Sequence, residues 1–587
     1  MVISSKKIFV VLTGIFYLCL ALFADYHVLG HFNSYSQCSC GDPGLFTWFL
    51  ALGEYNTIHL HNLFYTNFIW APLGANLMNS TSVIFLAVVF SPITALFGPV
   101  ASFNLAIILG IFLNAFSFFF VAKEITHNYQ ASFVAGCVFE INPFSIQALA
   151  YGQLNLGFDL FIPLSALLLY KLLSDPTKTW PAIVLGLTLG VEILISTELL
   201  SLWFVVAFIC LVLYLLLWQK QAILVLRSSI KKLLIGAVFA ILIWIIPLYW
   251  ALFGPNHLNE PPRPSPWFYG IGLLDFLLGN FVSSTRFHLA SGYSGTFSIA
   301  FVYLGVILVS VLFLGIILSL INKVRLKQVF FILLVTVVIY WFEIGSVFRL
   351  KGNAKLSQLH NFWFLPWKII NLIPLLKYAS PQRLSPFYWF FVGLLIAYAI
   401  KEITITSEKF LKKSSSFIFR NNIVVAVAAI LCLIQLLLSS NLPYRITRVT
   451  VPNWFIDSES FITKNANVLV IPSPFGITGT KDMVYQALTN FPFKLVGAQS
   501  IFIPKKELNE LAPPNALLAL KELSSGKLLN QQQQNLAKLA LMSMKINYVV
   551  MPAAKLNGFS AILIDAILKK PPIKVGSAWI WTVTAEG

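Results

Sequence analysis

The chain alternates between long apolar stretches and short polar connections. About twelve stretches approach the length of roughly 20 residues that a helix needs to cross the hydrocarbon of a bilayer. The pattern predicts membrane-spanning helices near residues 8–25, 81–98, 100–122, 131–150, 155–172, 181–197, 199–218, 233–253, 297–322, 328–347, 385–402 and 422–440. The first stretch follows two lysines, as the apolar part of a signal peptide does. No cleavage site is clear after it, so we interpret it as a retained anchor.

The final part of the chain, residues 441–587, has a different pattern. Short apolar runs predict strands, and a longer periodic run predicts a helix, at residues 468–472, 546–551 and 578–584 for the strands and 513–546 for the helix. About 140 residues is a normal size for a domain. The sequence therefore predicts an α-helical polytopic membrane module over residues 1–440, followed by a small extracytoplasmic α/β domain over residues 441–587.

Lysine and arginine indicate the orientation of the module. Cytoplasmic loops carry an excess of both residues, which predicts that three basic links lie inside: residues 219–232, 323–327 and 401–421. Three polar and aromatic regions are then expected outside: residues 26–80, 254–296 and 348–384. An N-terminus inside and a C-terminal domain outside require an odd number of crossings. We therefore expect about 11–13 helices, with a kinked or re-entrant piece in the first external region, such as 43–60 or 81–98.

Composition narrows the class of protein. The chain is 58% hydrophobic and only 11% charged, with a mean hydropathy of +0.81. A soluble domain is about 25% charged, and a disordered chain lacks this aromatic and aliphatic content. On a soluble protein the formal net charge of +18 would suggest nucleic-acid binding. Here the positive charge is spread among short loops, so no nucleic-acid partner is expected.

The first external region carries the earliest candidate for chemistry. Asp42 followed by Pro43 is typical of a helix start. The helix 43–53 is expected to lie along the membrane interface, anchored by Trp48 and Phe49. From these residues alone, Asp42 is equally well a helix cap or a functional acid. The nearby pair Cys38 and Cys40 is either free or part of a bridge, and it offers no complete metal site.

Further candidates are ionisable residues near the predicted outer surface. Asp159 lies at the outer start of the stretch 155–172, and its alternative role is a buried polar group satisfied by neighbouring amides. Arg383, Arg286 and His288 lie in the external regions. The planar guanidinium of arginine suits phosphate binding, although snorkelling to lipid head groups is its more common role. A second external helix, amphipathic and interfacial, is expected within residues 364–378.

Several short motifs follow one another in a recognisable order. They are Gly41-Asp-Pro-Gly-Leu-Phe-Thr-Trp48, Ile69-Trp-Ala-Pro-Leu-Gly-Ala-Asn-Leu77, Phe97-Gly-Pro-Val-Ala-Ser-Phe-Asn104, Tyr151-Gly-Gln-Leu-Asn155 and Pro381-Gln-Arg383. As an ordered set covering most of the chain, they resemble multi-spanning bacterial glycosyltransferases of the GT-C superfamily. The resemblance implies a GT-C-like fold in the bacterial plasma membrane and a catalytic acid in the first external loop, which by position is Asp42. It also implies a polyprenyl-phosphate sugar donor and a glycan, lipid or protein acceptor, in glycan biosynthesis of the cell envelope.

The sequence departs from the superfamily pattern in two places. Many members carry a second acid beside the first or two residues from it, often linked to metal use, whereas Gly41, Pro43 and Gly44 surround Asp42 here. A divalent metal is therefore allowed but not required, and no metal ligand is assigned. Gln153 stands where the resemblance implies His, so we assign Gln153 to substrate binding and not to catalysis.

These observations combine into one hypothesis, a glycosyltransferase that uses a lipid-phosphate donor. Asp42 accepts the proton of the acceptor hydroxyl as that oxygen attacks the anomeric carbon, and Arg383 or Arg286 holds the leaving phosphate. The other expected substrate-binding residues are Asp159, Asn155, Gln153 and His288. A single displacement predicts inversion at the anomeric carbon. The alternatives are a transporter or flippase of lipid-linked sugars, for which no internal repeat is evident, and a non-catalytic envelope scaffold.

Overall fold

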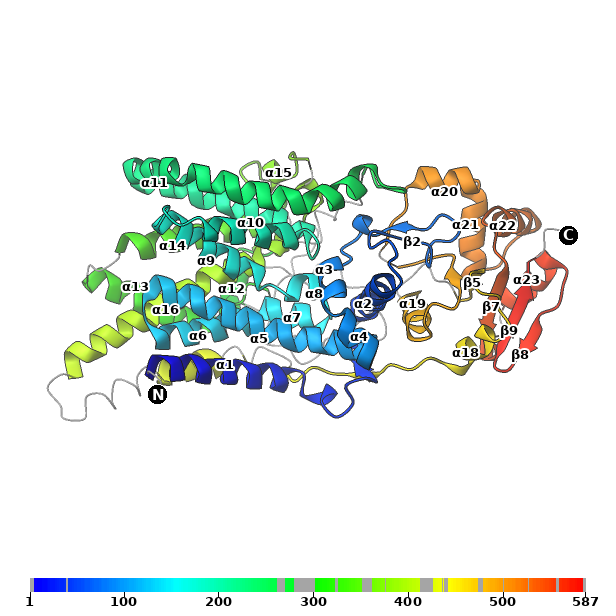
Figure 1. Ribbon diagram of the computed structural model, residues 1–587, viewed down its shortest axis with the longest axis horizontal. Helices are drawn as coiled ribbons and strands as arrows, with labels where there is room; N and C mark the ends of the chain where they lie inside the picture. Colours follow the sequence, from blue (N-terminus) through cyan, green and yellow to red (C-terminus); the bar gives the residue numbers. More distant parts are fainter. Residues whose placement is uncertain are drawn as a thin grey trace.

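The computed structural model describes residues 5–38, 41–260, 270–278, 301–322, 326–350, 362–374, 376–411, 426–434, 437, 442–472, 479–499, 501–525, 527–555 and 559–583. The helices up to residue 411 are α1 (Ser5–Ala24), α2 (Gly41–Ile58), α3 (Ile84–Val89), α4 (Ser91–Phe97), α5 (Pro99–Thr126), α6 (Tyr129–Glu140), α7 (Pro143–Ala150), α8 (Leu154–Gly157), α9 (Phe161–Ser174), α10 (Trp180–Glu192), α11 (Thr197–Phe253), α12 (Asp275–Leu278), α13 (Gly305–Asn322), α14 (Leu326–Glu343), α15 (Trp367–Ile370) and α16 (Ser385–Leu411). The long helices lie side by side along the longest axis of the molecule (Figure 1). The short helices α2, α3 and α4 lie between this bundle and the C-terminal domain (Figure 1).

Six of the described helices are long and apolar enough to cross a membrane, or seven if the bent pair α6 and α7 counts as one span. They are Lys6–Ala24, Pro99–Thr126, Leu154–Ser174, Thr197–Phe253, Leu326–Glu343 and Pro381–Ser407. Two shorter apolar helices, Trp180–Glu192 and Gly305–Ile321, match further predicted stretches. The last predicted stretch, 422–440, is described only at residues 426–434 and 437, which are helical. The exact number of crossings stays a prediction.

Helix α11 contains two predicted spans that fold back on each other. Its 57 residues would extend roughly 85 Å if straight, against a hydrocarbon thickness of about 30 Å. The backbone leaves helical geometry at Trp218, between the predicted spans 199–218 and 233–253. The rings of Phe204 and Trp244 nevertheless lie 6.1 Å apart. The two halves are therefore neighbours, as a hairpin of two spans requires.

The predicted span 81–98 is wrong. This stretch forms the separate short helices α3 and α4, of six and seven residues. Neither approaches the roughly 20 residues that a span needs. Pro92 stands in the first turn of α4 and Gly98 follows its end, so the apolar run is interrupted by residues that start and stop helices. The region between the spans α1 and α5 thus contains a kinked piece.

Helix α2 is buried and does not lie along an interface, as we had predicted for residues 43–53. Trp48 and Phe49 have exposed fractions of 0% and 2%. The helix packs against α3, α4 and α5 on the bundle side and against a helix of the C-terminal domain, Gly479–Leu488, on the other. The expected interfacial helix near 364–378 is also shorter than predicted, because only α15 and a 3-10 turn (Leu376–Tyr378) form there among the described residues.

The C-terminal domain is a five-stranded sheet with helices on both faces. Its strands are β5 (Asn467–Val470), β6 (Lys494–Leu495), β7 (Tyr548–Pro552), β8 (Ile573–Val575) and β9 (Ala578–Thr582), and its helices are α18 (Asn453–Glu459), α19 (Gly479–Leu488), α20 (Lys505–Leu511), α21 (Pro514–Ser524), α22 (Gln531–Ser543) and α23 (Phe559–Leu568). The strand order is β6-β5-β7-β9-β8, with β5 parallel to β6 and β7, and β9 antiparallel to β7 and β8. The predicted helix 513–546 is two helices, α21 and α22. The glutamine run starts α22, where Asn530 and Gln533 form a capping box.

The sheet alternates its apolar side chains between two cores, as successive strand residues point to opposite faces. Leu469, Val549 and Trp581 join a core with α21, α22 and α23. Val468 and Val550 join the same continuous core as the helical bundle. The predicted α/β domain is therefore packed directly on the membrane module. The division at residue 440 stays a prediction, because residues 438–441 lie outside the described residues.

Backbone hydrogen bonds also connect the two parts. The short strands β1 (Tyr35–Ser36) and β4 (Thr447–Arg448) pair antiparallel. At the edge strand β6, the amide of Leu495 donates to the carbonyl of Phe68 over 2.8 Å, and the carbonyl of Leu495 accepts from the amide of Ala71 over 3.0 Å. The region after α1 thus extends the sheet of the C-terminal domain at an edge that would otherwise be unpaired.

Candidate active site

Asp42 stands in the first turn of α2, where the bundle meets the C-terminal domain. Gly41 begins this helix with a φ of +58°, a left-handed conformation that favours glycine. The Asp42 side chain is half-buried, and its Oδ2 accepts a hydrogen bond of 2.7 Å from Nε2 of Gln153. The carboxylate is therefore held in one orientation by a residue from a different part of the chain.

The segment 151–155 reaches Asp42 by a close backbone approach. Gly152 has a φ of +66°, and a Cβ added there would lie 2.7 Å from Cγ of Pro43 and 2.8 Å from Cζ of Phe103. Only glycine fits both this conformation and this space. Asn155 follows two residues after Gln153 in the short helix α8 and is half-buried. Two of the predicted substrate-binding residues, Gln153 and Asn155, thus lie on the segment that contacts the candidate base.

Asp159 lies deeper, in a group of buried acids. Its exposed fraction is 2%, and those of Glu140 and Glu192 are 2% and 6%. Asp159 interacts electrostatically with both Glu140 and Glu192. Among the described residues, neither carboxylate oxygen of Asp159 or Glu140, and only one of the two oxygens of Glu192, finds a hydrogen-bond partner. The alternative that neighbouring amides satisfy Asp159 is therefore wrong for the residues that the structure describes.

Arg383 lies in a 3-10 turn, Pro381–Leu384, next to the start of α11. Its Nε lies 3.4 Å from Oε2 of Glu198, while Oε1 of Glu198 accepts a 2.8 Å hydrogen bond from the amide of Ser380. The Nε of Arg383 makes no hydrogen bond within the described part of the chain, so the contact is an ion pair without hydrogen-bond geometry. A carboxylate thus occupies one side of the guanidinium proposed to hold phosphate.

Two residues of the C-terminal domain reach α2 that the sequence did not suggest. The amide of Gly41 donates to Oγ1 of Thr480 over 2.8 Å, and Nε1 of Trp48 donates to Oε1 of Gln486 over 3.0 Å. Both partners lie on α19, a helix absent from the sequence prediction. No local motif around Thr480 or Gln486 marks them, because their importance comes only from the docking of α19 on α2.

Two predicted residues, Arg286 and His288, lie outside the described residues. No group of three or more His, Cys, Asp or Glu side chains within the described ranges is placed to hold a metal ion. Cys38 is disulfide-bonded, so the alternative of a free thiol is wrong for this residue. The four cysteines in apolar stretches, Cys19, Cys137, Cys210 and Cys432, are free.

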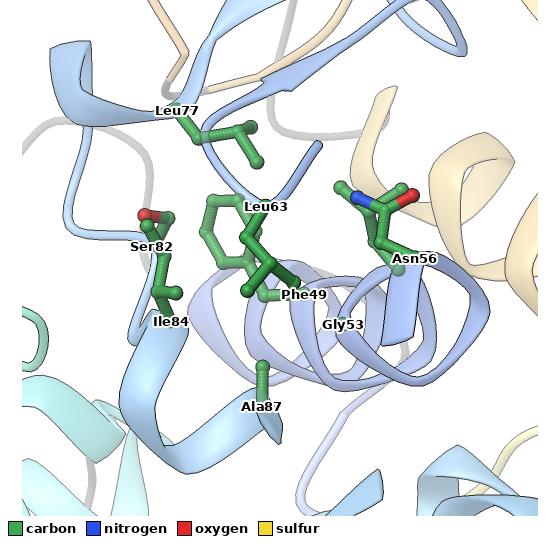
Figure 2. Close-up of a pocket in the computed structure, with 9 residues that line it drawn as sticks. Phe49, Gly53, Asn56, Leu63, Leu77, Ser82, Ile84 and Ala87 are labelled. Atoms are coloured by element: carbon green, nitrogen blue, oxygen red, sulfur yellow. The ribbon is translucent and has the colours of Figure 1, made fainter. Parts of the chain in front are cut away.

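A small pocket lies beside α2, and Figure 2 shows that α2, α3 and the intervening loop line it, with Phe49, Asn56, Leu77 and Ile84 among its residues. Its volume of about 10 Å³ is close to the space of one water molecule. Asp42 does not line it. The pocket is therefore too small and misplaced for a sugar donor.

Two carboxyl groups of the C-terminal domain have pKa values shifted in opposite directions. Burial raises the pKa of Asp482, on α19, from its ordinary 3.8 to about 8, and neighbouring Lys481 opposes this shift. Asp457, on α18, accepts hydrogen bonds of 2.7 Å from both the hydroxyl and the amide of Ser577. These bonds, the hydroxyl first, lower the pKa of Asp457 below its usual value.

Comparison with known proteins supports the fold. No family model matches the sequence, and neither does any curated protein. Among solved structures, the chain is similar to archaeal oligosaccharyltransferase AglB from Archaeoglobus fulgidus in complex with an inhibitory peptide and a dolichol-phosphate. The TM-score is 0.51 and the sequence identity 12%, covering 96% of this chain and 71% of that chain. A structure of the Archaeoglobus fulgidus oligosaccharyltransferase with Zn and sulfate has a TM-score of 0.44 at 12% identity, covering 92% of this chain and 68% of that chain.

At this level of identity the first likeness concerns the fold. Together with the apolar helices, it confirms the predicted class: an α-helical polytopic membrane protein with a GT-C-like fold and a C-terminal α/β domain.

Proposed function

We propose that this chain is a membrane glycosyltransferase that moves a sugar from a polyprenyl-phosphate donor to a glycan, lipid or protein acceptor. The observation that carries the proposal is the Asp42 carboxylate, fixed by Gln153 at the junction between the bundle and the C-terminal domain. A lipid-linked donor must keep its chain in the bilayer while its head group reaches a polar surface, and this junction is such a place. The fold is shared with AglB, whose structure contains a dolichol-phosphate and a peptide.

The proposed reaction is one displacement. The acceptor oxygen forms a bond to the anomeric carbon, and the bond between that carbon and the phosphate oxygen breaks. Asp42 takes the acceptor proton, and the bonding electrons leave with the polyprenyl phosphate. Arg383, or Arg286, stabilises the charge on the departing phosphate. Inversion at the anomeric carbon follows from attack on the face opposite the leaving group.

The substrate-binding assignments follow the same geometry. Gln153 orients the base, and Asn155 and Asp159 bind sugar hydroxyls on the segment that leads from Asp42 into the bundle, with His288 on the acceptor side. A divalent metal is admitted as an accessory to the phosphate, as the Zn-containing relative illustrates. The described residues contain no ready ligand set, and no step is derived through a metal.

We further propose a place in a bacterial plasma membrane, with the N-terminus inside and the C-terminal domain outside. The basic links 219–232 and 323–327 support this orientation through the excess of Lys and Arg inside the cell. A topology reporter fused after His127, at the end of α5, should give a cytoplasmic signal. An external signal would overturn the orientation and leave the reaction untouched.

The direct test uses the purified protein with a panel of labelled polyprenyl-phosphate sugars. We expect transfer or slow hydrolysis of one donor, and Asp42→Asn should reduce turnover about 10²–10⁴-fold, as removal of a general base does. The matched control is Asp175→Asn, because Asp175 forms an ion pair with Lys178 in an exposed turn. Near wild-type turnover in Asp42→Asn contradicts the catalytic role.

The same preparation separates the alternatives. A flippase moves the labelled donor across sealed proteoliposomes without breaking the sugar–phosphate bond. A scaffold does neither, and it depends on residues 441–587 but not on Asp42.

A further inference from the structure

Helix α2 is held by the C-terminal domain at two points. One is the amide of Gly41, immediately before Asp42, which donates to the Thr480 hydroxyl over 2.8 Å. The other is the indole of Trp48, six residues after Asp42, which donates to Gln486 over 3.0 Å. From this arrangement we infer that Thr480 is a positioning residue for Asp42, so that the C-terminal domain completes the active site. The inference rests on the proposed function.

The contact at Thr480 is well defined. The first amides of a helix have no partner within the helix and need one from elsewhere. Thr480 is fully buried, and its hydroxyl donates to Oε1 of Gln499 over 3.2 Å. Because the hydroxyl hydrogen is used by Gln499, the oxygen presents a lone pair to Gly41. This fixes the backbone at the residue whose left-handed conformation starts α2.

The contact at Gln486 makes the clamp rigid. Gln486 is fully buried, and Nε2 donates to the carbonyl of Phe68 over 2.8 Å and to that of Phe493 over 2.7 Å. Its carbonyl oxygen accepts from Trp48. Both ends of the amide are therefore satisfied, and fully satisfied buried networks favour one arrangement. Helix α2 cannot shift along α19 without breaking several of these bonds.

The two sides of Asp42 are thus held by different parts of the chain. Thr480 fixes the backbone from the C-terminal domain, and Gln153 fixes the carboxylate from the bundle. A misplacement of about 1 Å at a reacting group can cost on the order of 100-fold in rate. Loss of the Thr480 contact should therefore reduce the chemical step without changing the residues that bind donor.

The test compares Thr480→Val, which keeps the shape and removes the hydroxyl, with Thr480→Ser, which keeps the hydroxyl. Full-length protein is measured with the donor from the panel and by hydrogen exchange of the peptide covering residues 41–47. In Thr480→Val we expect faster exchange in this peptide, about a tenfold lower kcat and an unchanged KM for donor. Thr480→Ser should restore both values. The matched control is Thr489→Val, since the Thr489 hydroxyl bonds only within its own turn, to the carbonyls of Tyr485 and Gln486.

Each outcome decides the inference. Unchanged exchange in Thr480→Val, or faster exchange with wild-type kcat, overturns the positioning role while the proposed function stands on Asp42→Asn. Equal losses of kcat in Thr480→Val and Thr489→Val assign the effect to general damage and also overturn it. A wild-type protein that transfers no sugar overturns the proposed function, and the inference with it.

Discussion

Two aspartates near the same end of the bundle have opposite environments. Asp42 is half-buried, accepts a 2.7 Å hydrogen bond from Gln153 and follows a glycine whose amide is bonded to Thr480. Asp159 is 2% exposed and lies near two other buried acids, and both of its oxygens lack hydrogen-bond partners within the described ranges. One carboxylate is supported from both sides, and the other is buried without support.

The difference separates two uses of an acid. A supported, partly exposed carboxylate is pre-organised for contact with a substrate. A buried, unsupported polar group costs stability, and such a group is retained where a function requires it. For Asp159 that function is binding of sugar hydroxyls in our proposal, so substrate would supply the missing partners. Four predictions test this contrast.

The largest effect is expected at the support of Asp42. Gln153→Leu removes a hydrogen bond to a charged group, which is typically worth about 1.5–3 kcal/mol. We expect turnover to fall about 10- to 100-fold with little change in thermal stability. Gln328→Leu serves as the control, because Gln328 makes only a 3.4 Å contact with Tyr398 elsewhere in the bundle. Equal turnover in the two variants would remove Gln153 from the site.

The second effect concerns the unsupported acid. Asp159→Asn keeps the shape and removes a buried charge, so the melting temperature should rise, on the order of 2 °C. The efficiency kcat/KM for donor should fall about tenfold, since the amide cannot accept two hydroxyl donors as the carboxylate can. Differential scanning fluorimetry and the transfer assay measure the two values. A stabilised variant with unchanged kcat/KM would mean that Asp159 does not contact the sugar.

The third effect is smaller and concerns Arg383. Glu198→Gln removes the charge paired with Arg383 but leaves an oxygen for the amide of Ser380. If Arg383 binds the donor phosphate, release from Glu198 should lower the KM for donor about threefold, because a partly exposed ion pair is worth up to about 1 kcal/mol. Glu510→Gln is the control, because Glu510 pairs with Lys506 on the surface. An unchanged KM together with a lower melting temperature would make the pair a structural brace.

The smallest effect is a pH dependence of stability in the C-terminal domain. The folded protein holds a proton on Asp482 up to about pH 8, whereas the ordinary pKa is 3.8. Stability from this group is therefore complete below about pH 4 and is lost as the pH rises to about 8. Asp482→Asn should melt progressively higher than wild type over this range, by a few degrees at most.

Asp457 should behave with the opposite sign. Its pKa is lowered by hydrogen bonds from Ser577, so its contribution is present above the ordinary pKa of 3.8 and is lost as the pH falls through the lowered value. Asp457→Asn should therefore melt lower than wild type at pH 7 and converge with it in acid. Parallel pH curves for Asp482→Asn and Asp457→Asn would contradict both assignments.

The spans illustrate what a hydrophobic pattern can establish. Long apolar runs such as 100–122 and 328–347 became helices α5 and α14 close to the predicted positions, because in a bilayer the helix is the way to satisfy the backbone within one segment. The run 81–98 misled because its average hydrophobicity hides Pro92 and Gly98, which divide it into two short helices. Local residues that start and stop helices outweigh mean hydropathy there.

Burial of α2 could not be read from its sequence. Trp48 and Phe49 are typical interface anchors, and the same residues serve equally well in a core. The choice depended on α19, which covers the other side of α2 and supplies Gln486 for the Trp48 indole. The strands β5, β7 and β9 were predicted, but the helix that contacts α2 was not, because its short polar start carries little periodicity.

The sequence by itself determined the class of protein, the position of most helices, the presence of a C-terminal α/β domain and the choice of Asp42 as the candidate acid. These follow from composition, periodicity and motif order, which are properties of neighbouring residues. Only the tertiary structure placed Gln153 on the Asp42 carboxylate and Thr480 on the preceding amide, across 111 and 439 residues of chain. Such contacts depend on packing between distant segments, and no local pattern encodes the distance between two side chains.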